Sequence, residues 1–298
     1  MFARRFVGGA IVGLCLSAGL CAAAANAAAP SVPAAKAALA DNEYQKLIAD
    51  KGAAVVTVKF VMKMEMGGSG EAREFQEEAF GVMMDPKGIV LVSNFSMGGA
   101  AARMGRGGGG ITVTPTQIKV LIGDDTEGVD AKLVTRDSDL DLAWVKIEKP
   151  SDKPYVSVDF SKSVEAKVGE PLLTLDRLDK FFDRVPMVTE TKVGAIVKKP
   201  RTLVMPASEA RQFGAAVFTT GGAVVGFSTI LLPSEDDEEG AMSMNRFRGA
   251  IVVMPASEVV TATERAMKNP DGEAGTGDKK SETNKEEMKP ADKETEKK

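Results

Sequence analysis

Short stretches in which apolar and polar residues alternate dominate positions 53–260 of the chain. In AAVVTVKFVMKM, which starts at Ala53, polar Thr57, Lys59 and Lys63 fall on one face of an extended chain. The opposite face holds Val56, Val58, Phe60, Met62 and Met64. Alternation of this kind is typical of a strand with one buried side. Similar patterns predict further strands at 80–84, 89–92, 118–122, 131–135, 142–148, 172–175, 187–197, 202–205, 215–218, 223–229 and 249–253.

Turn signals separate these predicted strands, among them DPKG, GDD and TTGG. Many short strands joined by glycine and proline turns predict an all-β fold of antiparallel sandwiches or barrels. Helical spacing appears only at the edges of this region. It predicts a short helix at 42–50, stopped by Gly52, and a closing helix at 257–268.

Two insertions interrupt the strand pattern. The segment 97–110 has too much glycine for a strand or helix, which predicts a mobile loop. No Gly-Lys-Ser/Thr follows it, so it is not a phosphate loop. The acidic run 235–239 is interpreted as a solvated loop, with weak calcium binding or a basic partner as alternatives.

The two ends of the chain differ in composition from the middle. Residues 1–27 combine two arginines, an apolar run and the small-residue sequence ANA, which is the pattern of a cleaved export signal. A retained membrane anchor is the alternative, and a lipid-attachment site is disfavoured because Leu20 precedes Cys21. Residues 28–41 are expected to be a linker. The charged segment 269–298 is expected to be disordered, either a solubilising tail or one that binds a partner or surface.

Composition then excludes several kinds of chemistry. The chain contains no histidine, the usual general base and the commonest metal ligand. Its two cysteines, Cys15 and Cys21, lie in the predicted signal, so a secreted or periplasmic mature chain has no disulfide, thiolate metal site or cysteine nucleophile. We therefore predict neither a metal nor a cofactor. Cleavage removes two arginines, leaving 36 basic against 42 acidic residues, a charge of −6 that disfavours nucleic-acid binding.

Four segments in order resemble the HtrA (Deg) branch of the trypsin-like serine proteases. FGVMMDPKGIVLVSNFSM is similar to the family's GxGxxxDxxGxxxTNxHV, and VDAKLVTRDSDLDLAWVKIE to AxxxxxDxxxDLAxLKI. FGAAVFTTGGAVVGFSTI is similar to GNSGGPLxNxxGxVIGINT, and SKSVEAKVGEPLLTL resembles the stretch that enters the second barrel. The resemblance implies two perpendicular six-stranded β-barrels within 42–268, at about 53–150 and 155–254, with a cleft between them. We expect no PDZ domain after this region, because the segment 269–298 is expected to be disordered, and this departs from many family members.

The resemblance places the catalytic triad on residues that cannot perform catalysis. Phe95 stands at the histidine position, Asp141 at the aspartate position and Phe213 at the serine position. Without an adjacent base a serine hydroxyl is a weak nucleophile, and here the serine is missing as well. The family shapes its oxyanion turn with glycine, but this chain has Arg211 and Gln212 before Phe213, and only Gly214 remains.

These substitutions lead to predictions for the site itself. The two phenylalanine rings are expected to meet between the barrels and to replace the polar triad with apolar packing. Asp141 is expected to cap the turn before strand 142–148 through backbone hydrogen bonds. A calcium site is the alternative, because Asp137, Asp139, Asp141 and Glu148 have part of the spacing of a calcium loop, but Leu142 occupies the glycine position.

We therefore expect an exported, inactive domain that binds a peptide or protein partner in the inter-barrel groove by strand addition. The rival hypothesis from another class is an active serine endopeptidase. Ser93, Ser96 and Ser208 lie near the predicted site, although no serine–lysine pair stands out in the sequence. A third hypothesis is a structural component of an envelope assembly.

Overall fold

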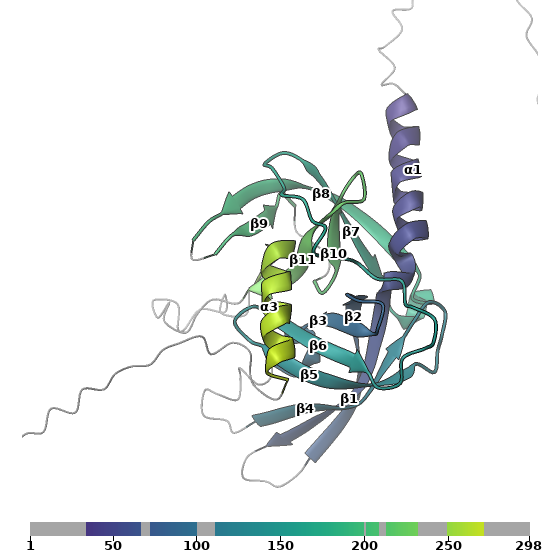
Figure 1. The fold of residues 1–298 in the computed structure, drawn as a ribbon, viewed down its shortest axis with the longest axis vertical. Coiled ribbons are helices and arrows are strands. Elements are labelled where there is room, and N and C mark those ends of the chain that lie inside the picture. The colour runs from purple at the N-terminus through teal and green to yellow at the C-terminus, as the bar shows by residue number, and fades with distance from the viewer. Residues whose placement is uncertain are drawn as a thin grey trace, which may run out of the picture.

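The structure is a computed structural model that describes residues 34–66, 72–99, 111–199, 201–208, 213–231 and 249–270. Twelve strands form two closed, antiparallel six-stranded barrels, with a helix before the first barrel and another after the second (Figure 1). The predicted all-β, two-barrel fold is confirmed. The signal segment 1–27, the linker up to residue 33, the acidic run 235–239 and the tail from residue 271 lie outside the described residues.

The first barrel has the strand order β1-β2-β3-β6-β5-β4. Its strands are β1 (Val55–Met66), β2 (Ala72–Met83), β3 (Ile89–Ser93), β4 (Ile111–Leu121), β5 (Val129–Asp137) and β6 (Leu142–Ile147). Val56, Val58 and Phe60 of β1 are buried as predicted, but Thr57, which was predicted on the polar face, is buried as well. The DPKG turn between β2 and β3 is held by Asp85, whose side chain accepts from the backbone N–H of Ile89 at 2.8 Å.

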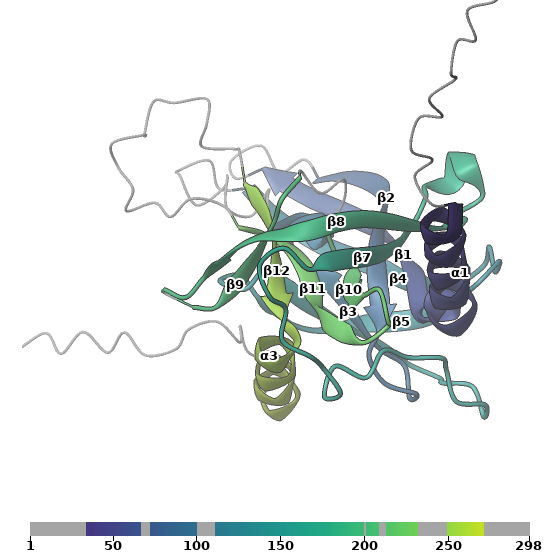
Figure 2. The same ribbon diagram turned by 90° about the horizontal axis from the view of Figure 1, so that it is seen from above.

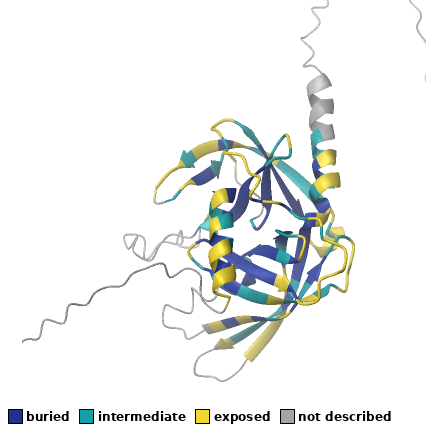
Figure 3. Ribbon diagram, viewed as in Figure 1, coloured by how far each residue is buried: buried dark blue, intermediate teal, exposed yellow. Residues whose placement is uncertain are grey.

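The second barrel has the strand order β10-β11-β12-β9-β8-β7. Its strands are β7 (Pro171–Arg177), β8 (Pro186–Val197), β9 (Leu203–Pro206), β10 (Ala216–Thr219), β11 (Val224–Leu231) and β12 (Ala250–Pro255). A small apolar cluster fills this barrel. It consists of Leu172, Val193, Val204, Val217, Val225 and Val253. The larger cluster begins in the first barrel and continues into the second through Phe218, Phe227 and Met254 (Figure 3).

The described residues also contain three short helical turns: η1 (Gly52–Ala54), η2 (Phe95–Gly99) and η3 (Lys180–Phe182). The predicted 97–110 loop was partly wrong, because Met97, Gly98 and Gly99 are buried in η2. The backbone carbonyl of Asn94 accepts from the N–H of Met97 at 3.1 Å and from that of Gly99 at 2.9 Å, which closes a tight turn. Residues 100–110 lie outside the described residues.

The two α-helices within the described residues join different parts of the molecule. Helix α1 (Ala34–Lys51) starts earlier than predicted and lies beside β8 of the second barrel (Figure 2). Its Leu47 is buried, and its Tyr44 hydroxyl donates to Glu190 of β8. Helix α3 (Ala256–Lys268) follows β12 and buries Val259, Ala262 and Ala266. Within the described residues, neither helix is long and apolar enough to cross a membrane.

The indole of Trp144 in β6 shows how α3 returns to the first barrel. Its ring is fully buried, and its Nε1–H donates to the Thr263 hydroxyl of α3 at 3.0 Å. Thr263 in turn donates to the backbone carbonyl of Val259 at 2.7 Å. The last described helix therefore covers a strand that belongs to the first barrel, so the two barrels share one continuous packing arrangement.

Candidate functional site between the barrels

Phe95, Asp141 and Phe213, the three positions singled out in the sequence, lie together in the fold. Phe95 begins η2 just after β3, and Asp141 directly precedes β6. Strands β3 and β6 are neighbours, with Ser93 opposite Leu142, so these two positions meet at the same barrel end. Phe213 lies three residues before β10 and brings a side chain from the second half of the chain.

The two phenylalanine rings are in contact. Their centroids are 5.5 Å apart and their planes are inclined by 87°, which is an edge-to-face arrangement. Both residues are half-buried. Such a pair contributes roughly 0.5–1.5 kcal/mol beyond the area that it buries. The expected ring contact is therefore present, and it joins the end of β3 to the segment that enters β10.

The carboxylate of Asp141 sits beneath this contact and accepts four hydrogen bonds from two barrels. Oδ1 accepts from the backbone N–H of Phe95 at 2.6 Å. Oδ2 accepts from the Ser93 hydroxyl at 2.7 Å, the Thr229 hydroxyl at 2.9 Å and the backbone N–H of Ile230 at 3.1 Å. The first two donors belong to the first barrel and the last two to β11 of the second. Asp141 is thus a polar link between the barrels.

Burial and hydrogen bonding have opposite effects on the ionisation of Asp141. The side chain is almost fully buried, and loss of hydration is the main cause that raises the pKa of this carboxyl above its ordinary value. The bonds from Ser93, Ile230, Phe95 and Thr229 act in the other direction because they stabilise the anion. The backbone at Asp141 has a φ of 56°, a left-handed conformation that aspartate tolerates better than most residues.

The prediction that Asp141 caps the turn before β6 was wrong, because Asp137 caps this turn instead. Asp137 at the end of β5 accepts from the backbone N–H groups of Asp139 at 3.1 Å and Leu140 at 3.0 Å through Oδ1. Burial, the largest cause, raises the pKa of Asp137 as well. Asp137 and Asp141 thus accept hydrogen bonds from different backbone N–H groups. The described residues hold no cluster of three acidic side chains suited to a metal.

The turn at Gly214 holds the Phe213 ring in place. Gly214 has a φ of 87°, and an added Cβ would lie 3.2 Å from the carbonyl oxygen of Phe80. Its N–H donates to the carbonyl of Ser228 at 2.7 Å, while the N–H of Ala215 donates to the Ser228 hydroxyl at 3.0 Å. The N–H of Gly214 is therefore bonded to β11 and is not free to stabilise an oxyanion. Arg211 and Gln212 lie outside the described residues.

The serines near the predicted site make other contacts. Ser93 is fully buried, and its hydroxyl donates a hydrogen bond to the carboxylate of Asp141. The Ser208 hydroxyl is exposed and pairs with that of Thr191 at 2.9 Å. Ser96 is half-buried in η2. Among the hydrogen bonds of the described chain, none of the three joins a lysine, so a serine–lysine dyad finds no geometric support here.

One side of β11 lacks a strand partner at its end. Residues Gly226–Leu231 pair with β12, but pairing with β10 stops at Phe227, opposite Ala216. Ser228 continues the pairing on this side, because its N–H donates to the carbonyl of Ala215 and its carbonyl accepts from the N–H of Gly214. Two residues further along the same side, the N–H of Ile230 donates to the carboxylate of Asp141. The carbonyl of Ile230 faces the same side. Within the described residues this leaves a short strand edge beside the phenylalanine pair.

Comparison with known proteins identifies the architecture. No protein-family model and no curated protein matches the sequence. Among solved structures, Deg5 superimposes with a TM-score of 0.54 and 15% identity over 77% of this chain and 96% of that one. The HtrA-type protease AlgW, solved with a decapeptide, gives a TM-score of 0.51 and 15% identity over 76% and 67% of the two chains.

This chain has the trypsin-like fold of HtrA-type proteases. At 15% identity the likeness establishes the fold alone. In this trypsin-like arrangement the two closed barrels meet at Phe95, Asp141 and Phe213, which are the positions that the sequence resemblance assigned to the triad.

A buried cation in the barrel interface was missed by the sequence reasoning. Arg177 at the end of β7 is 3% exposed. It reaches back to the first half of the trypsin-like fold, where Nε donates to the carbonyl of Val55 at 2.6 Å and Nη2 to that of Gly52 at 3.2 Å. Nη1 donates to the carbonyls of Gly123 at 3.1 Å and Arg184 at 2.8 Å. Burial lowers the pKa of the Arg177 guanidinium. The local sequence Asp176-Arg177-Leu178 gives no indication that the arginine is buried and bonded to four backbone carbonyls.

Proposed function

We propose that this chain is an exported, catalytically inactive HtrA-like domain that binds an extended peptide or protein segment between its barrels. The observation that carries the proposal is the Phe95–Phe213 contact, 5.5 Å between centroids, at the point where a base and a nucleophile would have to meet. Two apolar rings can neither accept nor transfer a proton. The absence of histidine from all 298 residues means that no other imidazole can take over.

Asp141 does not replace the missing base. A general base must reach the proton that it removes, within hydrogen-bond distance of the nucleophile. Both oxygens of Asp141 already accept bonds from the protein, and the nearest hydroxyl, that of Ser93, is fully buried. A substrate carbonyl in the cleft could not approach that hydroxyl without unpacking the barrel end. The carboxylate is therefore assigned a structural role, holding β3 and β11 together.

Binding requires much less than catalysis, and the site retains what binding needs. Ile230 of β11 has no strand partner on this side within the described residues, and its backbone carbonyl is offered to an extended chain. The adjoining phenylalanine pair is half-buried and provides apolar surface next to that edge. An extended segment that adds to β11 can satisfy its backbone there while one of its apolar side chains packs on the rings.

Activity is tested with casein and a fluorophosphonate probe on the purified chain. We expect no cleavage of casein above the level of a buffer control and no labelled serine in the mass spectrum. An HtrA protease of the active type, treated in parallel, shows that the reagents work. Labelling of any serine together with turnover of casein would establish the endopeptidase hypothesis and end the proposal of inactivity.

Binding is tested with unfolded casein as an extended-chain ligand, by fluorescence anisotropy. Phe95→Ala/Phe213→Ala removes the ring pair at the cleft, and we expect it to weaken casein binding. Phe181→Ala/Phe182→Ala is the matched control, because these two rings are also edge-to-face, with centroids 5.0 Å apart, but lie on η3. Equal loss in both variants would show that casein binds exposed aromatic rings in general and not the inter-barrel groove.

Export and the identity of the partner need separate measurements. N-terminal sequencing of the chain isolated from cells is expected to start near Ala28, after removal of residues 1–27. Crosslinking in the intact envelope distinguishes a binding domain with varied clients from the alternative of a structural component. A single stoichiometric neighbour, together with unchanged casein binding on loss of the ring pair, would favour the structural component.

A further inference from the structure

The outer half of β2 is a strand edge without a partner in the described chain. β2 pairs with β1 in an unbroken register from Val55–Val82 to Glu65–Ala72. On its other side it pairs with β3 only at Gly81, Val82 and Met83. Residues Ala72–Glu78 are exposed, and they belong to an arm of β1, β2 and β4 that extends from the first barrel (Figure 1). A long, unpaired edge of this kind can accept another strand.

The opposite edge of the same arm, on β4, is built to prevent such pairing. Strand β4 pairs with β5 only at Lys119 and Val120, so its outer half is also unpaired there. However, Pro115 has no N–H to donate, and Gln117 has a φ of 51° beside a register shift in the β1–β4 ladder. The β2 edge has no proline and no bulge. In the described part of the chain, the feature that protects this edge is charge, carried by Arg73, Glu74, Glu77 and by Glu78, which forms an ion pair with Arg184.

These charges complement one another when β2 faces a second copy of itself. A two-fold axis perpendicular to the sheet pairs antiparallel strands so that opposed residues share a face. If the axis passes between two copies of Phe75, Arg73 of each copy stands opposite Glu77 of the other. Phe75 then faces Phe75 at the centre, and Glu74 faces Gln76. Opposite charges meet twice, and no like charges are directly opposed.

The other registers centred on residues 73 to 77 oppose like charges. Centring the axis on Arg73, Glu74 or Glu77 places each of these residues against its own copy. Centring it on Gln76 places Glu74 against Glu78 twice. Directly opposed like charges destabilise a strand pair. Among the registers centred on residues 73 to 77, the one about Phe75 is therefore the one that opposes no like charges.

Phe75 has the position and exposure that this arrangement needs. It is 45% exposed, although it is a large apolar side chain on an otherwise charged strand. It lies opposite Met62 on the same face of the arm, and Met62 is half-buried. Across the proposed axis, two Phe75 rings and two Met62 side chains would form one apolar cluster. Contacts between methionine sulfur and aromatic rings are favourable.

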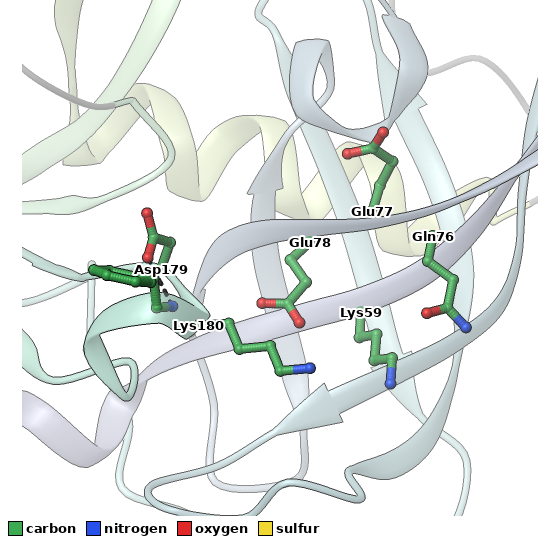
Figure 4. Close-up of a pocket in the computed structure, with 7 residues that line it drawn as sticks. Lys59, Gln76, Glu77, Glu78, Asp179 and Lys180 are labelled. Carbon is green, nitrogen blue, oxygen red and sulfur yellow. Dashed lines mark hydrogen bonds between the residues drawn. The ribbon is translucent and has the colours of Figure 1, made fainter.

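The geometry points to a homodimer in which the β2 edges of two copies pair antiparallel about Phe75 and join the two arms into one six-stranded sheet. The hollow beside the edge fits this arrangement (Figure 4). It has a volume of about 390 Å³ and is lined by Lys59, Gln76–Glu78 and, from the β7–β8 connection, Asp179–Phe181. The space beside Gln76 receives Glu74 of the second copy, and Lys59 and Lys180 supply ammonium groups there.

A charge-swap series tests the pairing by sedimentation velocity on the chain as it is isolated from cells that express the full sequence. We expect a concentration-dependent dimer for the natural sequence. Arg73→Glu and Glu77→Arg each oppose like charges twice, which raises the dimer dissociation constant about tenfold. The double variant R73E/E77R restores opposite charges, and we expect it to dimerise as the natural sequence does. Lys132→Glu and Glu148→Arg, exposed positions on the far side of the barrel, are the matched controls.

A cysteine pair tests the register directly, in a background with Cys15 and Cys21 changed to serine. Opposed residues have Cα atoms roughly 4.5–5.5 Å apart, within the range of a disulfide, so Phe75→Cys should crosslink two copies on oxidation. Gln76→Cys is the control, because two copies of Gln76 are offset by two residues, about 8 Å apart. A monomer at the highest attainable concentration, a trimer, a double variant that stays dissociated, or equal crosslinking of both cysteines would overturn the proposal.

Discussion

Replacing Arg177 with methionine tests what holds the two barrels together. Methionine keeps much of the length of the side chain but removes all four hydrogen bonds. Two of these, to the carbonyls of Val55 and Gly52, are buried, so water cannot easily replace the guanidinium there. The bonds to Gly123 and Arg184 are only part-buried. A buried polar group that loses its partner costs about 1–3 kcal/mol, and two such carbonyls set the scale of the loss.

Removal of a buried cation also has a favourable side. The lowered pKa of Arg177 shows that burial opposes its charged form, so the methionine variant regains part of that cost. Combining the two effects, we expect Arg177→Met to lower the free energy of unfolding by about 3 kcal/mol. Because most of the lost bonds run between the two halves of the chain, we also expect the barrels to unfold in separate steps.

Urea denaturation followed by tryptophan fluorescence and by far-ultraviolet circular dichroism measures both effects. Trp144 reports on the first barrel, whereas the dichroism reports on all strands, so separate transitions show as non-coincident curves. Arg184→Met is the matched control, since Arg184 forms a partly exposed ion pair with Glu78, worth at most about 1 kcal/mol. The reasoning fails if Arg177→Met is no more destabilising than this control.

Three further changes probe close contacts elsewhere. Gly226→Ala would put a Cβ 2.0 Å from the carbonyl oxygen of Met254, so we expect a loss of at least about 3 kcal/mol in urea denaturation. Thr263→Val removes the acceptor of the Trp144 indole and should cost about 1–2 kcal/mol, with a shift of the fluorescence maximum. Asp141→Asn offers one acceptor oxygen in place of two and should cost about 2–4 kcal/mol, measured by denaturation across a pH series.

The pH dependence of the Asp141→Asn variant has a definite sign. The folded-state pKa of Asp141 is raised above 3.8, so the folded chain holds this proton more readily than the unfolded chain. The contribution of Asp141 to stability is then greatest in acid and is lost as the pH rises through the folded pKa. The difference between the natural sequence and the variant should shrink as the pH rises. A difference that grows over that range would contradict the assigned direction.

The other two variants have simple controls. Gly221→Ala changes a turn glycine whose nearest neighbouring atom to an added Cβ is 3.7 Å away, so it should be nearly neutral where Gly226→Ala is not. Thr263→Ser keeps the hydroxyl that accepts from the Trp144 indole and should preserve the fluorescence maximum. If Thr263→Ser and Thr263→Val shift the spectrum equally, the hydrogen bond is not the cause.

Each of the twelve strands in the described residues overlaps a strand predicted from the sequence. The outer halves of two strands, β2 and β4, were not predicted. Strands such as 142–148 were predictable because their apolar residues pack in the barrel interior. The outer half of β2, Ala72–Glu78, is exposed on both faces, so no hydrophobic period marks it. The outer half of β4 contains Pro115, which is a signal against a strand unless the strand lies at an edge. Both misses belong to the arm. In β2 the extended chain is maintained by pairing with β1 and not by burial, whereas Val113 and Pro115 of β4 are buried.

The site was predictable to a different degree. The contact between Phe95 and Phe213 followed from the resemblance to HtrA-type proteases, because that resemblance supplies long-range proximity that a single sequence does not show. The partners of Asp141 did not follow. Its donors come from positions 93, 95, 229 and 230, and only the closed barrels bring those positions together. Local capping by Asp137 is the kind of short-range bond that sequence reasoning expects, but it assigned that bond to the wrong aspartate.

The docking of α3 on Trp144 has a consequence for how the chain reaches its final form. Strands β1–β6 are synthesised first, yet the helix that covers the indole comes more than a hundred residues later, after β12. During translation, the nascent first barrel displays an uncovered apolar patch until the C-terminal part has been synthesised. A chaperone that covers this patch would act in that interval. Its release would coincide with quenching or a blue shift of the fluorescence of Trp144, the single tryptophan of the chain.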